Sequence, residues 1–181
     1  MRRRSAIGLF LAVMVAAPLC TPSSAMAAVD TFLKIGDIKG EVVDIGHKDE
    51  IEILSWSWGA STGTARTKTG LLPAACIQDL ALMKSIDSST PPLILNSVTG
   101  EVAPEAVLTM RKAGESPLEF LILRMTNVTV ASYQISASSE LPTESFVLHF
   151  ESIKGEYRRQ KEDGSAEAPI FFEVGGGRCP N

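Results

Sequence analysis

Two histidines and three cysteines are the residues of this chain best suited to catalysis or metal binding. His47 lies in a charged loop, where we predict a solvated side chain, and His149 lies on a strand face, where we predict a surface or interface position. The sequence has no His-x-x-x-His pair, no Cys-x-x-Cys and no calcium-type carboxylate cluster, so no metal site is predicted. It also has no nucleophile elbow and no phosphate-binding loop. We therefore predict no catalytic residue and no cofactor, and an enzyme or toxin is the least favoured class.

The two tryptophans, Trp56 and Trp58, could line a sugar-binding site. At alternate positions of one strand, however, we assign them to the core. The chain has 181 residues, enough for one domain with its own core, and a formal net charge of −4. Because no basic stripe is present, nucleic acid is not an expected partner.

The first 27 residues have the order of a secretory signal peptide. A basic segment precedes an apolar stretch that is too short to span a bilayer, and Ala25 and Ala27 supply an A-x-A cleavage motif. We expect cleavage after Ala27, a mature domain over 28–181 with no membrane segment, and a secreted or periplasmic location. The alternative is a true start at Met26, which would give a cytoplasmic protein.

Cleavage would leave two cysteines, Cys76 and Cys179. Export permits a disulfide between them. Such a bond would close a loop of roughly a hundred residues and could stabilise the fold by up to ~4–5 kcal/mol on the chain-entropy model. The alternative is a half-buried Cys76 and a free thiol on the C-terminal tail. The sequence does not show whether the two residues meet.

Short apolar runs with a period of two residues predict a mainly β fold. Strands are expected at 32–35, 51–58, 77–86, 105–112, 118–133, 146–150, 153–160 and 169–174, with turns at 113–117 and 162–165. The stretch 59–75 is rich in Gly, Thr and Ala, and we predict a long loop there.

One helix is predicted at 91–99, with Ser89 or Thr90 as its capping residue. We expect it to pack on the sheet through an apolar face. That face comprises Leu93, Ile94 and Val98.

The second apolar run, Ile51 to Trp58, contains a slip in its alternation. Ile51 and Ile53 share one face, and from Leu54 through Trp56 the apolar side chains lie on the other. Such a slip predicts a β-bulge or a strand that leaves one sheet and enters another. We therefore predict an antiparallel two-sheet β-barrel or sandwich with one short flanking α-helix.

Four segments carry a resemblance to a known family: FLKIGDIKGE, HKDEIEILSWSWG, PEAVLTMRKAG and IKGEYRRQKEDGS. Together they resemble the haemolysin-coregulated protein family, Hcp, which forms the inner tube of the bacterial type VI secretion system. The resemblance runs from about 29 to 174. It implies a non-enzymatic β-barrel subunit of a homohexameric ring, with a spike protein and effectors as further partners.

Two features depart from that family. Similar proteins assemble in the cytoplasm and need no signal peptide, and the 59–75 stretch is richer in threonine than their glycine-rich excursion. We expect subunit contacts at edge strands and in the polar loop after the first strand. The loop candidates are Asp37, Lys39, Glu41, Asp44, His47, Lys48 and Asp49. The alternative function is an exported, monomeric, disulfide-bonded binding domain that builds no tube.

Overall fold

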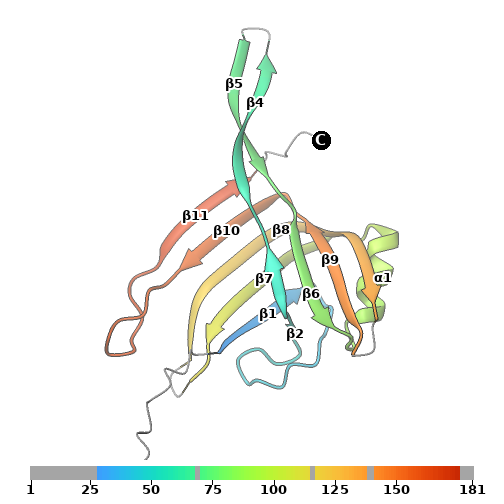
Figure 1. Cartoon of the computed structure of the whole chain (residues 1–181), viewed down its shortest axis with the longest axis vertical. Helices are drawn as coiled ribbons and strands as arrows, with labels where there is room; N and C mark the ends of the chain where they lie inside the picture. The colour runs from blue at the N-terminus through green and yellow to red at the C-terminus, as the bar shows by residue number, and fades with distance from the viewer. Residues whose placement is uncertain (1–27, 68–69, 115–116, 138–140, 176–181) are drawn as a thin grey trace, which may run out of the picture.

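The computed structural model describes residues 28–67, 70–114, 117–137 and 141–175. It is an antiparallel β structure with one helix on its flank and a long hairpin projecting from one end (Figure 1). The elements are β1 (Val29–Ile35), β2 (Ile51–Glu52), β3 (Ser55–Ser57), β4 (Ala60–Thr67), β5 (Gly70–Ile77), β6 (Leu80–Ser85), α1 (Thr90–Thr99), β7 (Ala103–Lys112), β8 (Leu118–Ser136), β9 (Thr143–His149), β10 (Ser152–Tyr157) and β11 (Ile170–Gly175). The predicted fold class is confirmed.

Two layers of sheet are joined through one long strand, β8. The hydrogen-bonded order is β2-β1-β7-β8-β9-β6-β3, and β10 branches from β8 with β11 at its outer edge. The first part of β8 pairs with β7 and β10, and the second part pairs with β9. Asn127 lies at the change of partner with a φ of 48°, a left-handed conformation that asparagine tolerates. This residue and a register shift between Val130 and Ser132 mark where β8 passes between the layers.

Residues 51–57 also cross between the layers, as the slip in their alternation predicts. β2 pairs with β1, whereas β3 pairs with β6. At the crossing, the amide of Ile53 donates to Thr31 of β1 at 2.9 Å, and the amide of Leu54 donates to Met83 of β6 at 2.8 Å. Consecutive amides therefore bond to different layers. Because β2 and β3 are the two ends of the strand order, the barrel is not closed.

The core lies between the layers and follows the predicted strand faces. Buried side chains from β7 and β9 include Ala106, Leu108, Met110, Phe146 and Leu148. Trp56 and Trp58 pack against this core, which confirms their assignment. Leu54 is 54% exposed, because it lies at the crossing and not on the buried face.

The helix α1 begins and ends where its sequence signals predict. Prolines occupy its first turn, and Gly100, with a φ of 69°, ends it by donating its amide to the carbonyl of Asn96 at 3.0 Å. Ser89 is the N-cap, but its hydroxyl bonds to Asp87 and makes no capping bond to the helix backbone. Within the described ranges, no helix is long and apolar enough to cross a membrane.

The predicted contact face of α1 is only partly correct. Leu93 is fully buried, but Ile94 is 37% exposed and Val98 is 76% exposed. Polar groups at the first turn set this orientation: the Thr90 hydroxyl donates to the carboxylate of Glu144 at 2.7 Å. The helix is therefore turned toward that buried carboxylate, which leaves Val98 in water.

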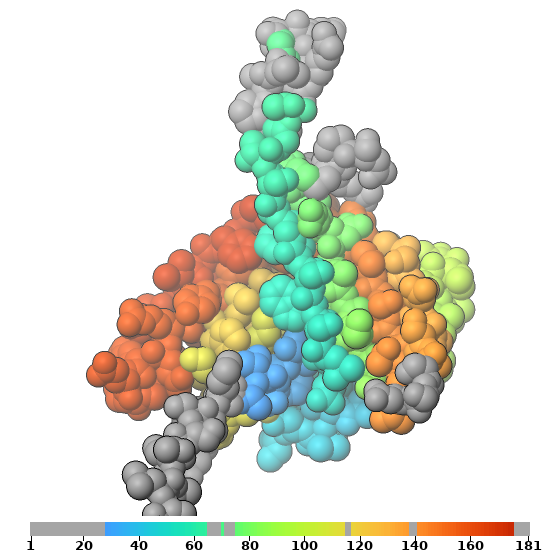
Figure 2. All heavy atoms as spheres, viewed as in Figure 1, coloured from blue at the N-terminus to red at the C-terminus, as the bar shows by residue number. Residues whose placement is uncertain are grey.

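The stretch 59–75 is not the predicted long loop. β4 and β5 pair in register from Ala60 opposite Ile77 to Thr67 opposite Gly70. In Figure 2 the coloured atoms of this hairpin rise from the front of the body toward the top of the view. Thr62 and Thr64 occur at alternate positions of β4. Because threonine favours strands, a composition rich in threonine is compatible with a hairpin and does not by itself indicate a loop.

Candidate functional site

The polar loop at 36–50 is held against the barrel through one aromatic ring, that of Phe32. The ring of His47 stacks on it with centroids 4.2 Å apart, and the Arg111 guanidinium lies 4.9 Å from its centroid. Phe32 is 5% exposed. A side chain of β1 therefore serves as the platform on which the loop is anchored.

Ion pairs from Arg111 fix the middle of the loop. One guanidinium nitrogen lies 2.9 Å from Asp44 and 3.1 Å from Asp30. The hydrogen bond from Arg111, followed by one from the Gly46 amide, lowers the pKa of Asp44 below the usual carboxyl value. The same bond raises the pKa of Arg111. The loop is thus fastened to β1 and β7 by charge as well as by stacking.

His47 is buried, so the prediction of a solvated loop histidine was wrong. Its Nδ1 lies 3.0 Å from Glu50, and its Nε2 lies 3.3 Å from Glu119 of β8. The side chain is only 7% exposed. The flat face of Phe32 explains the error, because it offers the imidazole an apolar surface while Glu50 pairs with Nδ1 by a hydrogen bond. His47 anchors the loop and is not available as a subunit contact.

The other predicted contact residues remain accessible to differing degrees. Asp37, Lys39, Glu41 and Lys48 are exposed, whereas Asp44 and Asp49 are half-buried. Lys39 forms an exposed pair with Asp49 at 3.4 Å. An exposed pair of this kind contributes little to stability, so both groups can exchange this contact for another.

Two apolar residues of the loop were missed by the sequence reasoning. Val43 is 92% exposed and Ile45 is 100% exposed. In the sequence, one apolar residue stands on either side of Asp44. In an extended segment, neighbouring side chains point in opposite directions, so the carboxylate faces the barrel and the two apolar side chains face water. A monomer gains nothing from this arrangement.

The edge strand β11 exposes a second apolar surface. Ile170 is 69% exposed, Phe171 is 56% exposed and Phe172 is 39% exposed. β11 pairs with β10 on one side and forms the outer edge of the sheet on the other (Figure 1). An apolar edge strand is a ready pairing surface for another chain.

The inner face of β11 is shaped around Phe172. Its ring stacks with Trp58 at 5.9 Å between centroids, and it lies directly over Gly155 of β10. A Cβ at position 155 would lie 1.9 Å from the Phe172 ring, so only glycine fits there. This packing fixes the edge strand to the barrel and leaves Ile170 and Phe171 accessible for contact.

Comparison with known proteins shows which family this chain belongs to. The family model described as type VI secretion system effector, Hcp, matches residues 32–157. The chain belongs to the Hcp family of the type VI secretion system. The protein hcp1 of Pseudomonas aeruginosa strain PAO1 is 41% identical over 151 residues, which is 80% of this chain and 93% of that protein.

Solved Hcp structures share the fold. A crystal structure of Hcp1 from Salmonella typhimurium is 33% identical, with a TM-score of 0.66, and covers 83% of this chain and 95% of that one. A structure described as a type six secretion system protein is 29% identical, with a TM-score of 0.71, and covers 79% of this chain and 92% of that one.

Membership of the Hcp family makes this chain a structural tube subunit of the secretion system and not an enzyme. The near-complete coverage of the Pseudomonas relative does not favour the alternative of a monomeric binding domain that has left the tube. Among the residues that the structure describes, no group of three or more His, Cys, Asp or Glu side chains could hold a metal ion.

The remaining candidate residues of this Hcp-family chain are only partly within the described ranges. Cys76 is in a disulfide and is 9% exposed. Cys179 and the cleavage motif Ala25 and Ala27 lie outside the described residues, so the pairing and the signal peptide stay predictions. His149 is 21% exposed and its Nδ1 lies 2.7 Å from Asp79, a surface position that agrees with the prediction.

Proposed function

We propose that the chain assembles into homohexameric rings that stack into a tube, with a spike protein at the tip and effectors as cargo. Three consecutive exposed apolar residues on the edge strand β11 carry this proposal. Large apolar side chains at a sheet edge promote aggregation of a monomer, whereas in an assembly they are buried in contacts between subunits. Membership of the Hcp family supports the same conclusion.

The opposite flank of the barrel offers a surface that β11 could meet. Leu54 is 54% exposed, Met83 is 41% exposed and Ile86 is 48% exposed, all close to the junction of β3 and β6. β11 and β6 lie on different sides of the barrel (Figure 1). A contact between two different surfaces of the same chain is head-to-tail, and it closes into a ring when the rotation between copies fits.

Light scattering tests this assembly. The mature chain is expected to have the mass of a hexamer, and the double variant Ile170→Ser, Phe171→Ser is expected to be a folded monomer. Val98→Ser, on α1, serves as the matched control because it removes an exposed apolar side chain that is not on β11. A wild-type chain that stays monomeric at high concentration would overturn the proposal.

We further propose that the chain is exported through the predicted signal peptide and is cut after Ala27. The disulfide at Cys76 supports an oxidising compartment, since such bonds are rare in the cytoplasm. N-terminal sequencing separates the two routes. A first residue of Ala28 would establish cleavage, whereas a start at Met26 in cytosolic material would mean delivery by the type VI machine itself.

A further inference from the structure

Two further surfaces of the chain are apolar, exposed and opposite in charge. One is the loop tip, residues 43–48, and the other is a groove beside α1, here called the α1 groove. Neither surface includes any part of β11 or the flank of β6. They can therefore make a contact that is separate from the one that closes a ring.

The loop tip is held rigidly with its apolar side chains in water. Asp44 is bonded to Arg111 at 2.9 Å and also accepts the Gly46 amide at 2.9 Å. On either side of it, Val43 is 92% exposed and Ile45 is 100% exposed. A pre-organised loop loses little conformational freedom on binding, so these two side chains are suited to act as anchors.

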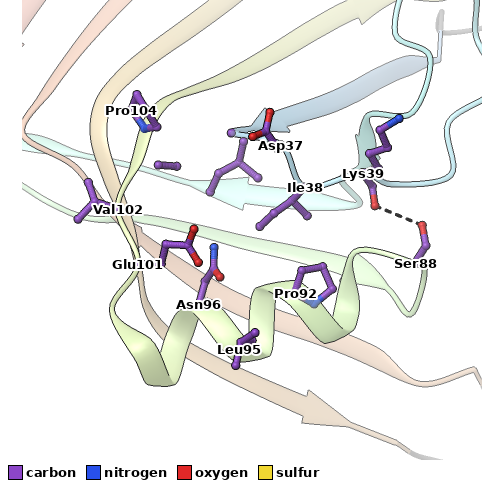
Figure 3. Close-up of a pocket in the computed structure, with 13 residues that line it drawn as sticks. Asp37, Ile38, Lys39, Ser88, Pro92, Leu95, Asn96, Glu101, Val102 and Pro104 are labelled. Atoms are coloured by element: carbon purple, nitrogen blue, oxygen red, sulfur yellow. Dashed lines mark hydrogen bonds between the residues drawn. The ribbon is translucent and has the colours of Figure 1, made fainter.

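The α1 groove has a volume of about 530 Å³ and lies between α1, the turn after β1 and the segment that leads into β7 (Figure 3). Leu95 is 57% exposed and Val102 is 55% exposed, and Ile38 and Pro92 complete an apolar lining. The size of the groove suits a few aliphatic side chains.

Charge distinguishes the two surfaces. Asp37, Glu101 and Lys39 are exposed at the groove. Lys39 pairs with Asp49 at 3.4 Å, so the net charge of the groove is negative, whereas the exposed ion of the tip is Lys48. The negative charge of Asp44 is already paired with Arg111 and does not oppose this match. The acidic groove and the basic tip are thus complementary.

The tip cannot fill the groove of its own chain. Ile45 lines a separate pocket, which shares only the turn at 36–39 with the α1 groove. The turn therefore separates the two surfaces within one molecule. The occupant that fits by shape and charge is the tip of a second copy.

We propose that Val43 and Ile45 of one copy insert into the α1 groove of another copy, with Lys48 placed against Asp37 and Glu101. The inference rests on the proposed function, because both need self-association. Since the tip and the groove are different surfaces, the contact is heterologous and can repeat from copy to copy. With the β11 edge used inside a ring, this second contact joins one ring to the next.

Disulfide trapping between two separate variants tests the contact directly. Ile45→Cys and Leu95→Cys are purified apart, mixed and mildly oxidised. Only the mixture is expected to yield a covalent dimer, which denaturing electrophoresis without reductant detects. Ile45→Cys mixed with Val98→Cys is the matched control, because Val98 is on α1 but does not line the groove.

Charge reversal supplies an independent test. Lys48→Glu and Glu101→Lys are each expected to weaken assembly beyond the ring by about tenfold, and the double variant is expected to restore it. Val43→Ser with Ile45→Ser should keep the hexamer mass and lose larger species in sedimentation velocity. Circular dichroism confirms the fold of each variant.

The outcomes separate this inference from the proposed function. Hexamers without the cross-link between the Ile45→Cys and Leu95→Cys variants, or without rescue by the double reversal, would overturn the contact and leave the ring intact. A monomeric wild-type chain would overturn both. A cross-link in the monomeric β11 variant at high protein concentration would support the contact while showing that it forms independently of the ring.

Discussion

At the scale of single residues, the most consequential arrangement is the set of groups around Phe32. An aromatic ring, an imidazole and a guanidinium lie together, and carboxylates lie beside the two nitrogen-bearing groups. Each contact is modest alone. Their concentration on one ring turns a polar loop into a fixed part of the barrel surface, which is what the assembly proposals require.

Asp44 makes the fastening of this loop sensitive to acid. Its pKa is lowered in the folded chain, so its stabilising effect is present above the ordinary carboxyl pKa of 3.8 and is lost as the pH falls through the lowered value. Asp44→Asn is therefore expected to lower the urea midpoint at pH 7 and to differ little from wild type in strong acid. Asp37→Asn, at an exposed site, is the control. An equal loss at both pH values would contradict this role of the ionised carboxylate.

Residue-level signals predicted well wherever a local backbone rule decided the outcome. Gly100 ends α1 as expected, and Gly164 has a φ of 83° in the predicted turn. His47 was mispredicted because its environment comes from Phe32, fifteen positions away in the chain, and from Glu119 on β8. The correct predictions therefore depend on neighbouring residues, whereas the error concerns contacts with residues that are distant in the sequence.

At the scale of elements, a buried ionic network joins β6, β9 and the start of α1. The Lys84 ammonium lies 2.7 Å from Glu144 and 2.7 Å from Asp87, and both Lys84 and Glu144 have fully buried side chains. Burial, with Glu144 nearby, raises the pKa of Tyr133 and keeps its hydroxyl neutral. The network orients the helix, which explains why Leu93 faces the core and Val98 does not.

Removing the cation from this network is expected to be costly. Lys84→Met leaves Glu144 buried without its partner and should lower the free energy of unfolding by about 3–5 kcal/mol. Combining it with Glu144→Leu should recover part of that loss, because neither of the two fully buried charges is then left, and Asp87, which is 13% exposed, keeps its hydrogen bonds from Ser89. Urea denaturation measures both, with Lys161→Met at an exposed site as the control. A double variant no more stable than Lys84→Met would contradict the assignment.

Among the elements, the crossing at Ile53 and Leu54 was predictable and the hairpin was not. The slip in apolar alternation can be seen in the local sequence. It arises because β2 pairs with β1 in one layer and β3 pairs with β6 in the other, so the apolar face changes between them. Most of the described side chains of β4 are exposed, and the strand carries no alternation of apolar residues. Its pairing with β5 begins with Ala60 opposite Ile77. Composition alone does not reveal such a register.

At the scale of the whole molecule, exposed apolar groups occur in several separate places, among them β11 and the loop tip. A monomer would need neither, whereas a stack of rings needs one contact within a ring and another between rings. The family membership predicted from sequence segments is confirmed by the match of the Hcp family model over residues 32–157. The sequence could not locate the surfaces, because exposure of Ile45 or Phe171 is decided only by the folded arrangement around them.

The disulfide at Cys76 bears both on the stability of the fold and on the compartment through which the chain has passed. Cys76 is opposite Ser61 at the base of the projecting hairpin. We expect non-reducing peptide mapping to find it joined to Cys179, a bond that would close a loop of roughly a hundred residues and stabilise the fold by up to about 4–5 kcal/mol. Reduction should then lower the thermal midpoint by about 10 °C.

The variant Cys179→Ser checks that prediction, since its midpoint should match that of the reduced wild type and should not respond to reductant. Cys20 is the third cysteine of the chain, and cleavage after Ala27 would remove it. A map that joined Cys76 to Cys20 would contradict both the C-terminal link and the signal peptide, because the first 27 residues would then have to remain on the folded protein. The partner of Cys76 therefore tests, in one measurement, how the hairpin base is fastened and which compartment the chain has passed through.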